Sequence, residues 1–507
     1  MSLKGFSFKI IMIVLALGLL LAALITFVPF GLVKSKEGPH SLNSNGFQQV
    51  DCWFDNSEAS IQAQCGYLFS KGELLTYKLP VVVLQSNDNN LHEKKILAQK
   101  PIMYLGGGPG AGLGLDKRAI NHWIGWYQRY QLSQPLILMD YRSTGLSTPQ
   151  FQCTPFVKAY SDSILAPEKV SSSDLYTITR DCFRIWRDRG YSTFDFTIEN
   201  NAYDVLALAH ELQISEFDIY SVSYGTRVAL ALTQIQPERI GRIVLDSPVS
   251  PTQAGVNFWP SRLSASFIRY FAYCATEKTC TLTEKQLFGY LKELAAHSLA
   301  VEVVNWSNNL PVNIHLTDHL LVSALYSDFL KFSTLNTKEL STSQLLVDNR
   351  EFRAFIEEFI NHAITDDFNF LVYYANTCLA NKPYNPETYT SQYVPTQWQP
   401  YTRYRPEFDV CQLIENKKIR QLPFHRINNP TLILAGALDS VTPIEGAQQI
   451  YDDFEQVILA VFSQSSHGVL SSNTCLQNVL PDFYNNITIT PSQFDRCDQS
   501  VELKNKP

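Results

Sequence analysis

Ser223 stands at a corner between two different kinds of sequence. The residues before it, FDIYSV (217–222), are aromatic and β-branched, whereas those after it, TRVALALTQ, are rich in Ala and Leu. A serine is a nucleophile only when a base takes its proton and its side chain projects from the backbone. A tight strand-to-helix turn of the pattern G-x-S-x-G provides that projection. Gly225 fits this pattern, and Ser221 replaces its first glycine with another small residue. We therefore predict Ser223 as a nucleophile, with an ordinary strand-to-helix turn as the alternative.

A glycine-rich loop, YLGGGPGAG (104–112), follows an early apolar run. Glycines leave backbone N–H groups uncovered, and in a strand-turn-helix hydrolase site such a loop supplies one of the two oxyanion donors. The alternatives are a plain glycine turn or a dinucleotide-binding loop, but Pro109 removes a donor within the loop. We predict that the N–H of Tyr224 and those of Gly107 and Gly108 hold the oxyanion.

Two further segments supply an acid and a base. Asp439 follows a strand-like run in LILAGALDSVTP, with Thr442 placed to hydrogen-bond it, and His467 follows the last such run in FSQSSHG. A carboxylate that accepts the imidazole Nδ1–H orients it as a general base. Asp246 is the rival acid, and Asp439 could instead only cap a helix. The chain order Ser…Asp…His is that of the α/β-hydrolases, so we predict Ser223, Asp439 and His467 as a catalytic triad.

The elements that must position these residues alternate along the chain. Runs of strand length, several of them apolar at consecutive positions, are TYKLPVVVLQ, KPIMYLGGG, QPLILMDYR, FDIYSVS, RIVLDSP, PTLILAGALDS and QVILAVFSQSSHG. Helical spacing appears between them, in NAYDVLALAHELQ and TRVALALTQIQPERI. This alternation predicts a mostly parallel central sheet flanked by helices, the α/β-hydrolase fold.

The alternation stops in the middle of the chain. Amphipathic helix patterns prevail there, in TEKQLFGYLKELAAHSLAV, LTDHLLVSALYSDFLKF and EFRAFIEEFINHAI. We predict a mainly helical cap over 256–420, inserted between core segments 36–255 and 421–507.

Length and charge exclude some functions. The chain has 507 residues, 45% of them hydrophobic, and a net charge of −7. Such a chain buries a sizeable core and has no basic stripe, which argues against nucleic acid as a partner. Two H-E pairs, at His92 and His210, lack the second histidine of H-E-x-x-H, and the pair His315 and His319 fits exposed residues better than a zinc site. We predict that no metal or organic cofactor is needed.

The N-terminus is apolar enough to enter a membrane. Residues 10–28 carry no charge, and as a helix they would span roughly 28 Å. We predict a signal anchor within residues 1–35, with a cleaved signal peptide or a buried core helix as alternatives, and a polar tether over 36–50. The protein would then be exported, either anchored in the membrane by this segment or secreted.

All of the cysteines lie beyond this apolar segment. They are Cys52, Cys65, Cys153, Cys182, Cys274, Cys280, Cys378, Cys411, Cys475 and Cys497. An even number behind an export signal indicates disulfides in an oxidising compartment, and the spacing suggests that neighbours pair in order. The alternative is a set of reduced cysteines in the core of a cytosolic enzyme.

Four of these segments together resemble the prolyl iminopeptidase and tripeptidyl aminopeptidase family of α/β-hydrolases. GGGPG resembles the family's H-G-G-P-G loop, and DYRSTGLS (140–147) its D-x-R-G-x-G-x-S segment, with Ser143 in place of a glycine. SVSYGTRVA resembles its nucleophile turn, and GALDSVTP its acid loop. The N-terminal pair Cys52 and Cys65 and the stretch from Cys475 to Cys497 are similar to those of secreted tripeptidyl aminopeptidases.

The resemblance implies a lid of inserted helices and carboxylates that hold the free amino terminus of a peptide. The lid offers five candidates, none of which is assigned: Asp328, Glu357, Glu358, Asp366 and Asp367. The expected function is therefore an exported serine aminopeptidase that acts on short peptides. A carboxylesterase or lipase on the same fold is the alternative, and a non-catalytic binding protein is a third reading.

Overall fold

The computed structural model describes most of the chain after the N-terminal segment. The described residues are 44–55, 60–87, 100–165, 172–251, 259–276, 282–305, 309–327, 331, 349–363, 368–379, 396–399, 411, 413, 414, 425–486, 488–490, 493, 494, 497 and 502–505. The predicted anchor at residues 1–35 lies outside them. Among the helices that are described, none has the length and apolar content that crossing a bilayer requires.

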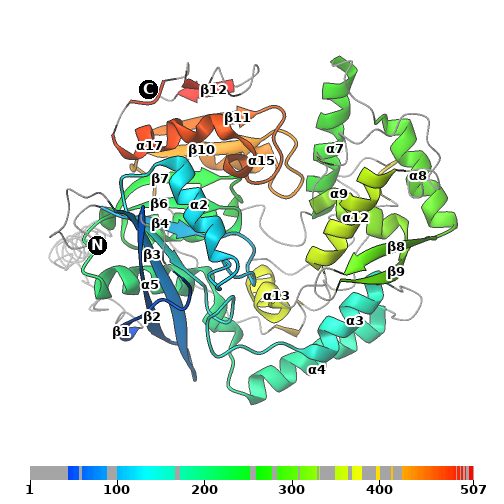
Figure 1. Cartoon of the computed structure of the whole chain (residues 1–507). Coiled ribbons are helices and arrows are strands. Elements are labelled where there is room, and N and C mark those ends of the chain that lie inside the picture. Colours follow the sequence, from blue (N-terminus) through cyan, green and yellow to red (C-terminus); the bar gives the residue numbers. More distant parts are fainter. Residues whose placement is uncertain are drawn as a thin grey trace, which may run out of the picture. The chain divides into compact units, whose positions relative to one another are not determined.

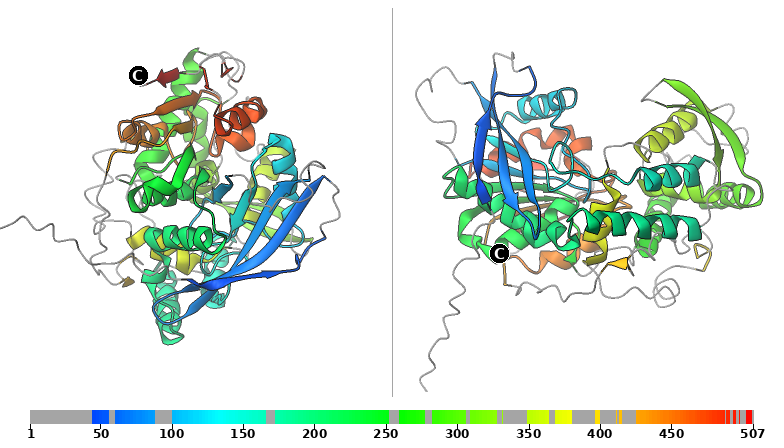
Figure 2. Two further views of the ribbon diagram at one scale, coloured as in Figure 1. Left: turned by 90° about the vertical axis from the view of Figure 1, so that its left-hand side faces the viewer. Right: turned by 90° about the horizontal axis from the view of Figure 1, so that it is seen from below.

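One sheet organises the described residues, and Figures 1 and 2 show it from three directions. In spatial order its strands are β1 (Ser44–Val50), β2 (Ile61–Lys71), β3 (Thr76–Ser86), β5 (Leu136–Met139), β4 (Ile102–Leu105), β6 (Phe217–Val222), β7 (Ile240–Asp246), β10 (Thr431–Gly436), β11 (Val457–Phe462) and β12 (Glu502–Asn505). The strands from β5 to β11 pair in parallel, and those at the two edges pair antiparallel. This is the predicted α/β-hydrolase architecture.

The central strands are buried on both faces, as their sequences predict. Every residue of β5 and of β10 is buried. On one face the tryptophans Trp123 and Trp126 of helix α2 (Ile120–Tyr130) pack in a hydrophobic cluster with residues of α17 (Val479–Tyr484) and of the strands. Helix α6 (Tyr224–Ile235) contacts β4, β6 and β7, and α5 (Ile198–Glu211) contacts α6. The apolar runs of the sequence therefore form the buried strands of the sheet that carries the candidate residues.

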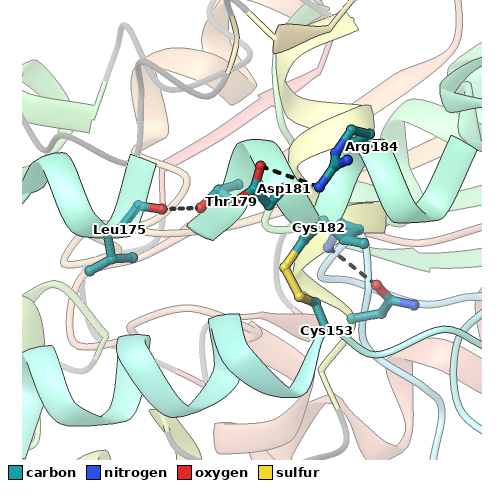
Figure 3. Close-up of a disulfide and its surroundings, with 8 residues drawn as sticks. Cys153, Leu175, Thr179, Asp181, Cys182 and Arg184 are labelled. Carbon is teal, nitrogen blue, oxygen red and sulfur yellow. Dashed lines mark hydrogen bonds and ion pairs between the residues drawn. A yellow bond between two sulfur atoms is a disulfide. The ribbon is translucent and has the colours of Figure 1, made fainter. Parts of the chain in front are cut away.

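The remaining core helices connect or cover the strands. They are α3 (Thr154–Leu165), α4 (Ser172–Asp188), α15 (Ile444–Tyr451) and α16 (Val469–Ser472), with the 3₁₀ turns η2 (Thr193–Phe196), η3 (Pro237–Arg239) and η7 (Thr474–Gln477). Helices α3 and α4 were not expected from the sequence. The disulfide between Cys153 and Cys182 joins the start of α3 to α4, as Figure 3 shows.

The segment between β7 and β10 has a hydrophobic cluster of its own, to which Leu438 also belongs. Its elements are α7 (Trp259–Thr276), α8 (Glu284–Ala296), β8 (Leu299–Asn305), β9 (Leu310–Leu316), α9 (Asp318–Ser327), α12 (Arg350–Ala363) and α13 (Phe370–Leu379). Within its described residues the segment is mainly helical, but β8 and β9 pair as an antiparallel hairpin. The helix pattern over 283–301 therefore extends too far, because Val301 and Val303 are buried in alternation, as in a strand.

The prediction of a polar tether over 36–50 is wrong for residues 44–50. These residues form β1, which pairs antiparallel with β2 and extends the sheet at one edge (blue in Figure 2). Their polar composition suits an edge strand, where one side faces solvent.

Four disulfides match the predicted neighbouring pairs. Besides Cys153–Cys182, they are Cys52–Cys65, Cys378–Cys411 and Cys475–Cys497, with Cα–Cα distances of 5.0, 5.1 and 5.2 Å. Cys274 is also disulfide-bonded. Its predicted partner, Cys280, lies outside the described residues.

A fully buried ion pair fixes the segment that resembles D-x-R-G-x-G-x-S. Arg142 donates through Nε to Oδ2 of Asp204 at 2.7 Å and through Nη2 to Oδ1 at 2.8 Å. It also donates to the hydroxyl of Ser70 and to the carbonyl of Asp195. Both charged side chains are only 1% exposed. The pair thus connects β2, the turn after β5, and α5 in the interior.

We expect Asp204→Asn to destabilise the fold strongly, since it leaves Arg142 buried with only the more distant carboxylate of Asp195, 3.9 Å away. Loss of one partner of a buried pair costs about 3–5 kcal/mol. The exposed pair Lys158–Asp162 is the matched control, and Asp162→Asn should cost less than about 0.5 kcal/mol. The free energy of unfolding in urea measures both, and equal losses in the two variants would contradict the structural role of Arg142.

Candidate active site

Ser223 occupies the tight turn between β6 and α6. Its backbone has φ 53° and ψ −121°, a left-handed conformation that β-strands and helices do not use. Its N–H donates to the carbonyl of Asp246 at 3.0 Å. A Cβ at Gly225 would lie 2.0 Å from the carbonyl oxygen of Leu105, so only glycine fits there. The predicted strand-turn-helix corner is therefore present.

Ser221 takes the place of the first glycine of the pattern without disturbing the turn. It is fully buried, and its hydroxyl donates to the carbonyl of Val244 on the neighbouring strand at 2.8 Å. A buried hydroxyl needs such a partner. The departure from G-x-S-x-G is thus accommodated by one hydrogen bond.

The glycine loop reaches the serine directly. A Cβ built on Gly107 would lie 3.1 Å from the Cβ of Ser223 and 3.7 Å from its Oγ. Gly108 has φ +58°, which favours glycine. Tyr224 is the first residue of α6, where the backbone N–H has no acceptor in its own helix. The three predicted oxyanion donors thus come from the loop beside Ser223 and the helix that follows it.

The carboxylate of Asp140 accepts hydrogen bonds from backbone groups next to this loop. Asp140 was not identified as a site residue from the sequence. Its Oδ1 accepts the N–H of Leu113 at 2.7 Å, and its Oδ2 accepts the N–H of Leu146 at 2.8 Å. Burial raises the pKa of Asp140 to about 6, although these two N–H groups oppose the rise. The sequence signal was its place at the start of DYRSTGLS.

Asp439 and His467 are joined as predicted. The distance from Nδ1 of His467 to Oδ2 of Asp439 is 2.8 Å. The Thr442 hydroxyl donates to the same Oδ2 at 2.7 Å, while the N–H groups of Val441 and Thr442 donate to Oδ1. The fully buried carboxylate is thereby saturated with donors, and it fixes one edge of the imidazole.

The charges of this pair shift both pKa values. Burial would raise the pKa of Asp439. The positive charge and the hydrogen bond of His467, together with two hydrogen bonds from Thr442, instead lower this pKa below its ordinary value. Burial would lower the pKa of His467, yet the charge and hydrogen bond of Asp439, with a contribution from Asp246, raise it. The pair therefore favours a carboxylate beside an imidazole that readily accepts a proton.

Asp246, the rival acid, occupies a different position. Its buried carboxylate accepts the N–H of Val469 at 2.8 Å and that of Leu470 at 2.9 Å, just after His467. Its own carbonyl accepts the N–H of Ser223. The next residue, Ser247, accepts the N–H of Gly468 at 2.9 Å. The end of β7 thus ties the serine turn to the histidine loop.

In the part of the chain that the structure describes, the Ser223 hydroxyl and the imidazole of His467 share no hydrogen bond. Hydrogen bonds between catalytic groups are often long without substrate and tighten when it binds. The structure thus joins Asp439, Thr442 and His467 directly, and connects Ser223 to them through Asp246 and Ser247.

The side chain of Tyr224 links the core to the inserted segment. Its hydroxyl donates to Oδ1 of Asn376 on α13 at 2.6 Å and accepts from Nδ2 of Asn201 on α5 at 2.9 Å. Neither asparagine was identified from the sequence, where nothing distinguishes them from other polar helix residues.

The carboxylates suggested for amine binding have other partners. Glu357 accepts the N–H of Val304 on β8, and Glu358 forms an ion pair with Lys331. The other three candidates, Asp328, Asp366 and Asp367, lie outside the described residues.

We expect Asp246→Asn to weaken the connection between the serine turn and the loop that carries His467. An amide nitrogen would face backbone N–H donors, and loss of a buried hydrogen bond to a charged group costs about 1.5–3 kcal/mol. Displacement of His467 by even 1 Å should slow labelling of Ser223 by a fluorophosphonate on the order of 10²-fold. Asp452→Asn, at an exposed position, is the control and should change neither thermal unfolding nor labelling. Unchanged labelling of Asp246→Asn would show that the contact does not position the histidine.

Solved structures of similar fold have low sequence identity to the chain, and no curated protein matches it. A serine hydrolase from Cycloclasticus zankles is 13% identical, with a TM-score of 0.36, over 84% of this chain and 98% of that one. An esterase from Exiguobacterium antarcticum is 12% identical, with a TM-score of 0.36, over 81% and 96%. At this level neither indicates a substrate.

A family model gives a more direct assignment. The model is described as alpha/beta hydrolase fold, and it matches residues 100–474 of the 507. This range includes the glycine loop, the serine turn, Asp439 and His467. The chain therefore belongs to the alpha/beta hydrolase fold family.

Proposed function

We propose that this hydrolase is an exported serine aminopeptidase that cleaves short peptides from a free N-terminus. The observation that carries the proposal is the hydrogen bond between His467 Nδ1 and Asp439 Oδ2 at 2.8 Å, in a site where Gly107 lies against Ser223. A base oriented by an acid, a projecting hydroxyl and backbone donors are the parts that acyl transfer requires.

In the proposed reaction His467 takes the proton of Ser223 as Oγ attacks the scissile carbonyl carbon. The negative charge that develops on the carbonyl oxygen is held by the N–H of Tyr224 and of the Gly107–Gly108 loop. His467 then gives the proton to the leaving amine, and the C–N bond breaks. Water, deprotonated by His467, hydrolyses the acyl-enzyme and restores the serine. No metal ion or organic cofactor takes part.

Preference for peptides is supported by the motifs shared with the aminopeptidase family and by the inserted segment. Helix α13 contacts the serine turn through Asn376 and Tyr224. Asn369, the residue before α13, contacts the glycine loop, because its N–H donates to the carbonyl of Gly110 at 2.8 Å. A segment packed so near the nucleophile limits the size of the substrate. Short peptides fit this arrangement better than folded proteins.

Export is supported by the disulfides. Four bridges are present among the described residues, and such bonds persist mainly in oxidising compartments. The apolar N-terminal segment would attach the protein to the membrane, or would be removed to release it.

A carboxylesterase or lipase is the second candidate. Ester and amide hydrolysis use the same oxyanion intermediate, so the proposed site serves either reaction. The two candidates differ in whether a free amine is recognised.

We expect the purified protein to hydrolyse aminoacyl and tripeptidyl arylamides, and to lose about 10–100-fold in kcat/KM when the amine is acetylated, since a charged hydrogen bond to the amine would be lost. Ser223→Ala should abolish hydrolysis while thermal unfolding stays unchanged. Equal rates on free and acetylated substrates, with faster cleavage of simple esters, would favour the esterase instead.

We expect the acid limb of the kcat/KM profile to lie above pH 6.5, the ordinary histidine pKa. The base must be neutral to accept the serine proton, and the Asp439 carboxylate raises the pKa of His467. Asp439→Asn should move the limb to lower pH and reduce kcat by about 10⁴-fold. Thr442→Val, which removes only a hydroxyl, should have a much smaller effect. A limb that does not move in Asp439→Asn would exclude His467 as the titrating base.

A further inference from the structure

Arg227 lies one helical turn after the nucleophile and takes no part in the mechanism described so far. It is the fourth residue of α6, which begins directly after Ser223. Side chains on a helix tilt towards its N-terminus, so a long side chain at this position covers the first turn. Arg227 is therefore placed to extend along the turn that carries Ser223 and Tyr224.

The Nε of Arg227 has no hydrogen-bond acceptor among the residues that the structure describes. This atom is buried, and among the described residues no ion pair joins the guanidinium to a carboxylate. The side chain as a whole is partly exposed, so it remains open to a ligand. Burial lowers the pKa of Arg227 to about 10, which leaves it charged at neutral pH. A partly buried cation without an ion-pair partner among the described residues loses some of its hydration, and groups with shifted pKa values concentrate at functional sites.

Arg227 and the imidazole of His467 share one charged neighbour. The positive charge of Arg262, on α7, lowers the pKa of Arg227 and also that of His467. Arg262 is thus close to both groups, and its Nη1 lies 3.5 Å from the carbonyl of Val441 in the acid loop. The acid whose charge acts on Arg227 is Glu199, which raises its pKa but forms no ion pair with it in the described structure. Arg227 thus has one cation, Arg262, and one acid, Glu199, among its charged neighbours.

We propose that Arg227 binds a carboxylate of the substrate. The peptides cleaved by the proposed aminopeptidase, on which this inference rests, would carry a carboxylate close to the scissile bond: either the C-terminal group of a very short peptide or an acidic side chain. The planar fork of arginine binds a carboxylate through two parallel hydrogen bonds. Arg262 adds a second positive charge, which reinforces the preference for an anion.

Matched peptides test both sources of the carboxylate. Free Ala-Ala-Ala is compared with its C-terminal amide, and amidated Ala-Glu-Ala with amidated Ala-Gln-Ala. We expect the wild-type protein to favour the charged member of at least one pair by about 10–100-fold in kcat/KM, as a charged hydrogen bond implies. Arg227→Gln should abolish this preference while retaining turnover of the neutral member. Arg118→Gln, at a side chain that is 97% exposed, should retain the preference.

A second pair of substrates separates this inference from the proposed function. Para-nitrophenyl hemisuccinate and para-nitrophenyl butyrate are esters of similar size that differ in one carboxylate. If peptides are not cleaved, the aminopeptidase proposal fails, but a preference for the hemisuccinate that disappears in Arg227→Gln still supports the subsite.

Two further measurements keep the proposal testable if Arg227→Gln does not fold. Arg227→Lys keeps the charge but not the fork, and it should retain only part of the preference. Calorimetry on Ser223→Ala should show tighter binding of the charged peptide without turnover. Equal kinetics for charged and neutral substrates in the wild-type protein, or an undiminished preference in Arg227→Gln, would overturn the proposal.

Discussion

The site depends on the hydrogen bonds made by one buried residue at the end of β7. The carbonyl of Asp246 accepts the N–H of Ser223, and its carboxylate accepts those of Val469 and Leu470. The serine turn and the histidine loop are more than 240 positions apart in the sequence, and they have no direct hydrogen bond between their functional groups. Their relative placement therefore depends on the strand that lies beside β6 and β10 in the sheet. A carboxylate is suited to this work because it can accept two N–H groups at once, while its charge also raises the pKa of His467.

Much of the fold and the candidate residues could be predicted because the signals are local. The strands β3 to β7, β10 and β11 are short apolar runs, and the turn at Ser223 needs small residues at fixed positions on either side. The assignment of Asp439 over Asp246 follows from the same logic, since the strand-turn-acid segment sits where the chain order Ser…Asp…His requires it. The structure gives the physical reason for the choice: the Asp246 carboxylate is occupied by backbone N–H groups, whereas Asp439 has an oxygen directed to His467.

The features that the sequence did not reveal depend on contacts between distant segments. Residues 44–50 are polar and form a strand only because β2 offers an edge with which to pair. Asn201 and Asn376 acquire their role from the hydroxyl of Tyr224, which lies between them. Asp140 is recognisable only when the N–H groups of Leu113 and Leu146 converge on it. Arg227 is conspicuous because its Nε has no hydrogen-bond acceptor in the described part of the chain, and no sequence pattern reports such a feature.

The inserted segment also belongs to the site, because α13 contacts both proposed sources of oxyanion donors. Asn376 accepts a hydrogen bond from the Tyr224 side chain, whose backbone N–H is one donor. At the other end, Asn369 donates to the carbonyl of Gly110, two residues after Gly108, and Phe368 bridges to Ala111. A shift of α13 would therefore move the tyrosine and the glycine loop together. Since oxyanion stabilisation requires donors held within a few tenths of an ångström of their best positions, α13 cannot act only as a cover. The position of α13 would therefore affect both the space for a substrate and the placement of the N–H groups proposed to stabilise the transition state.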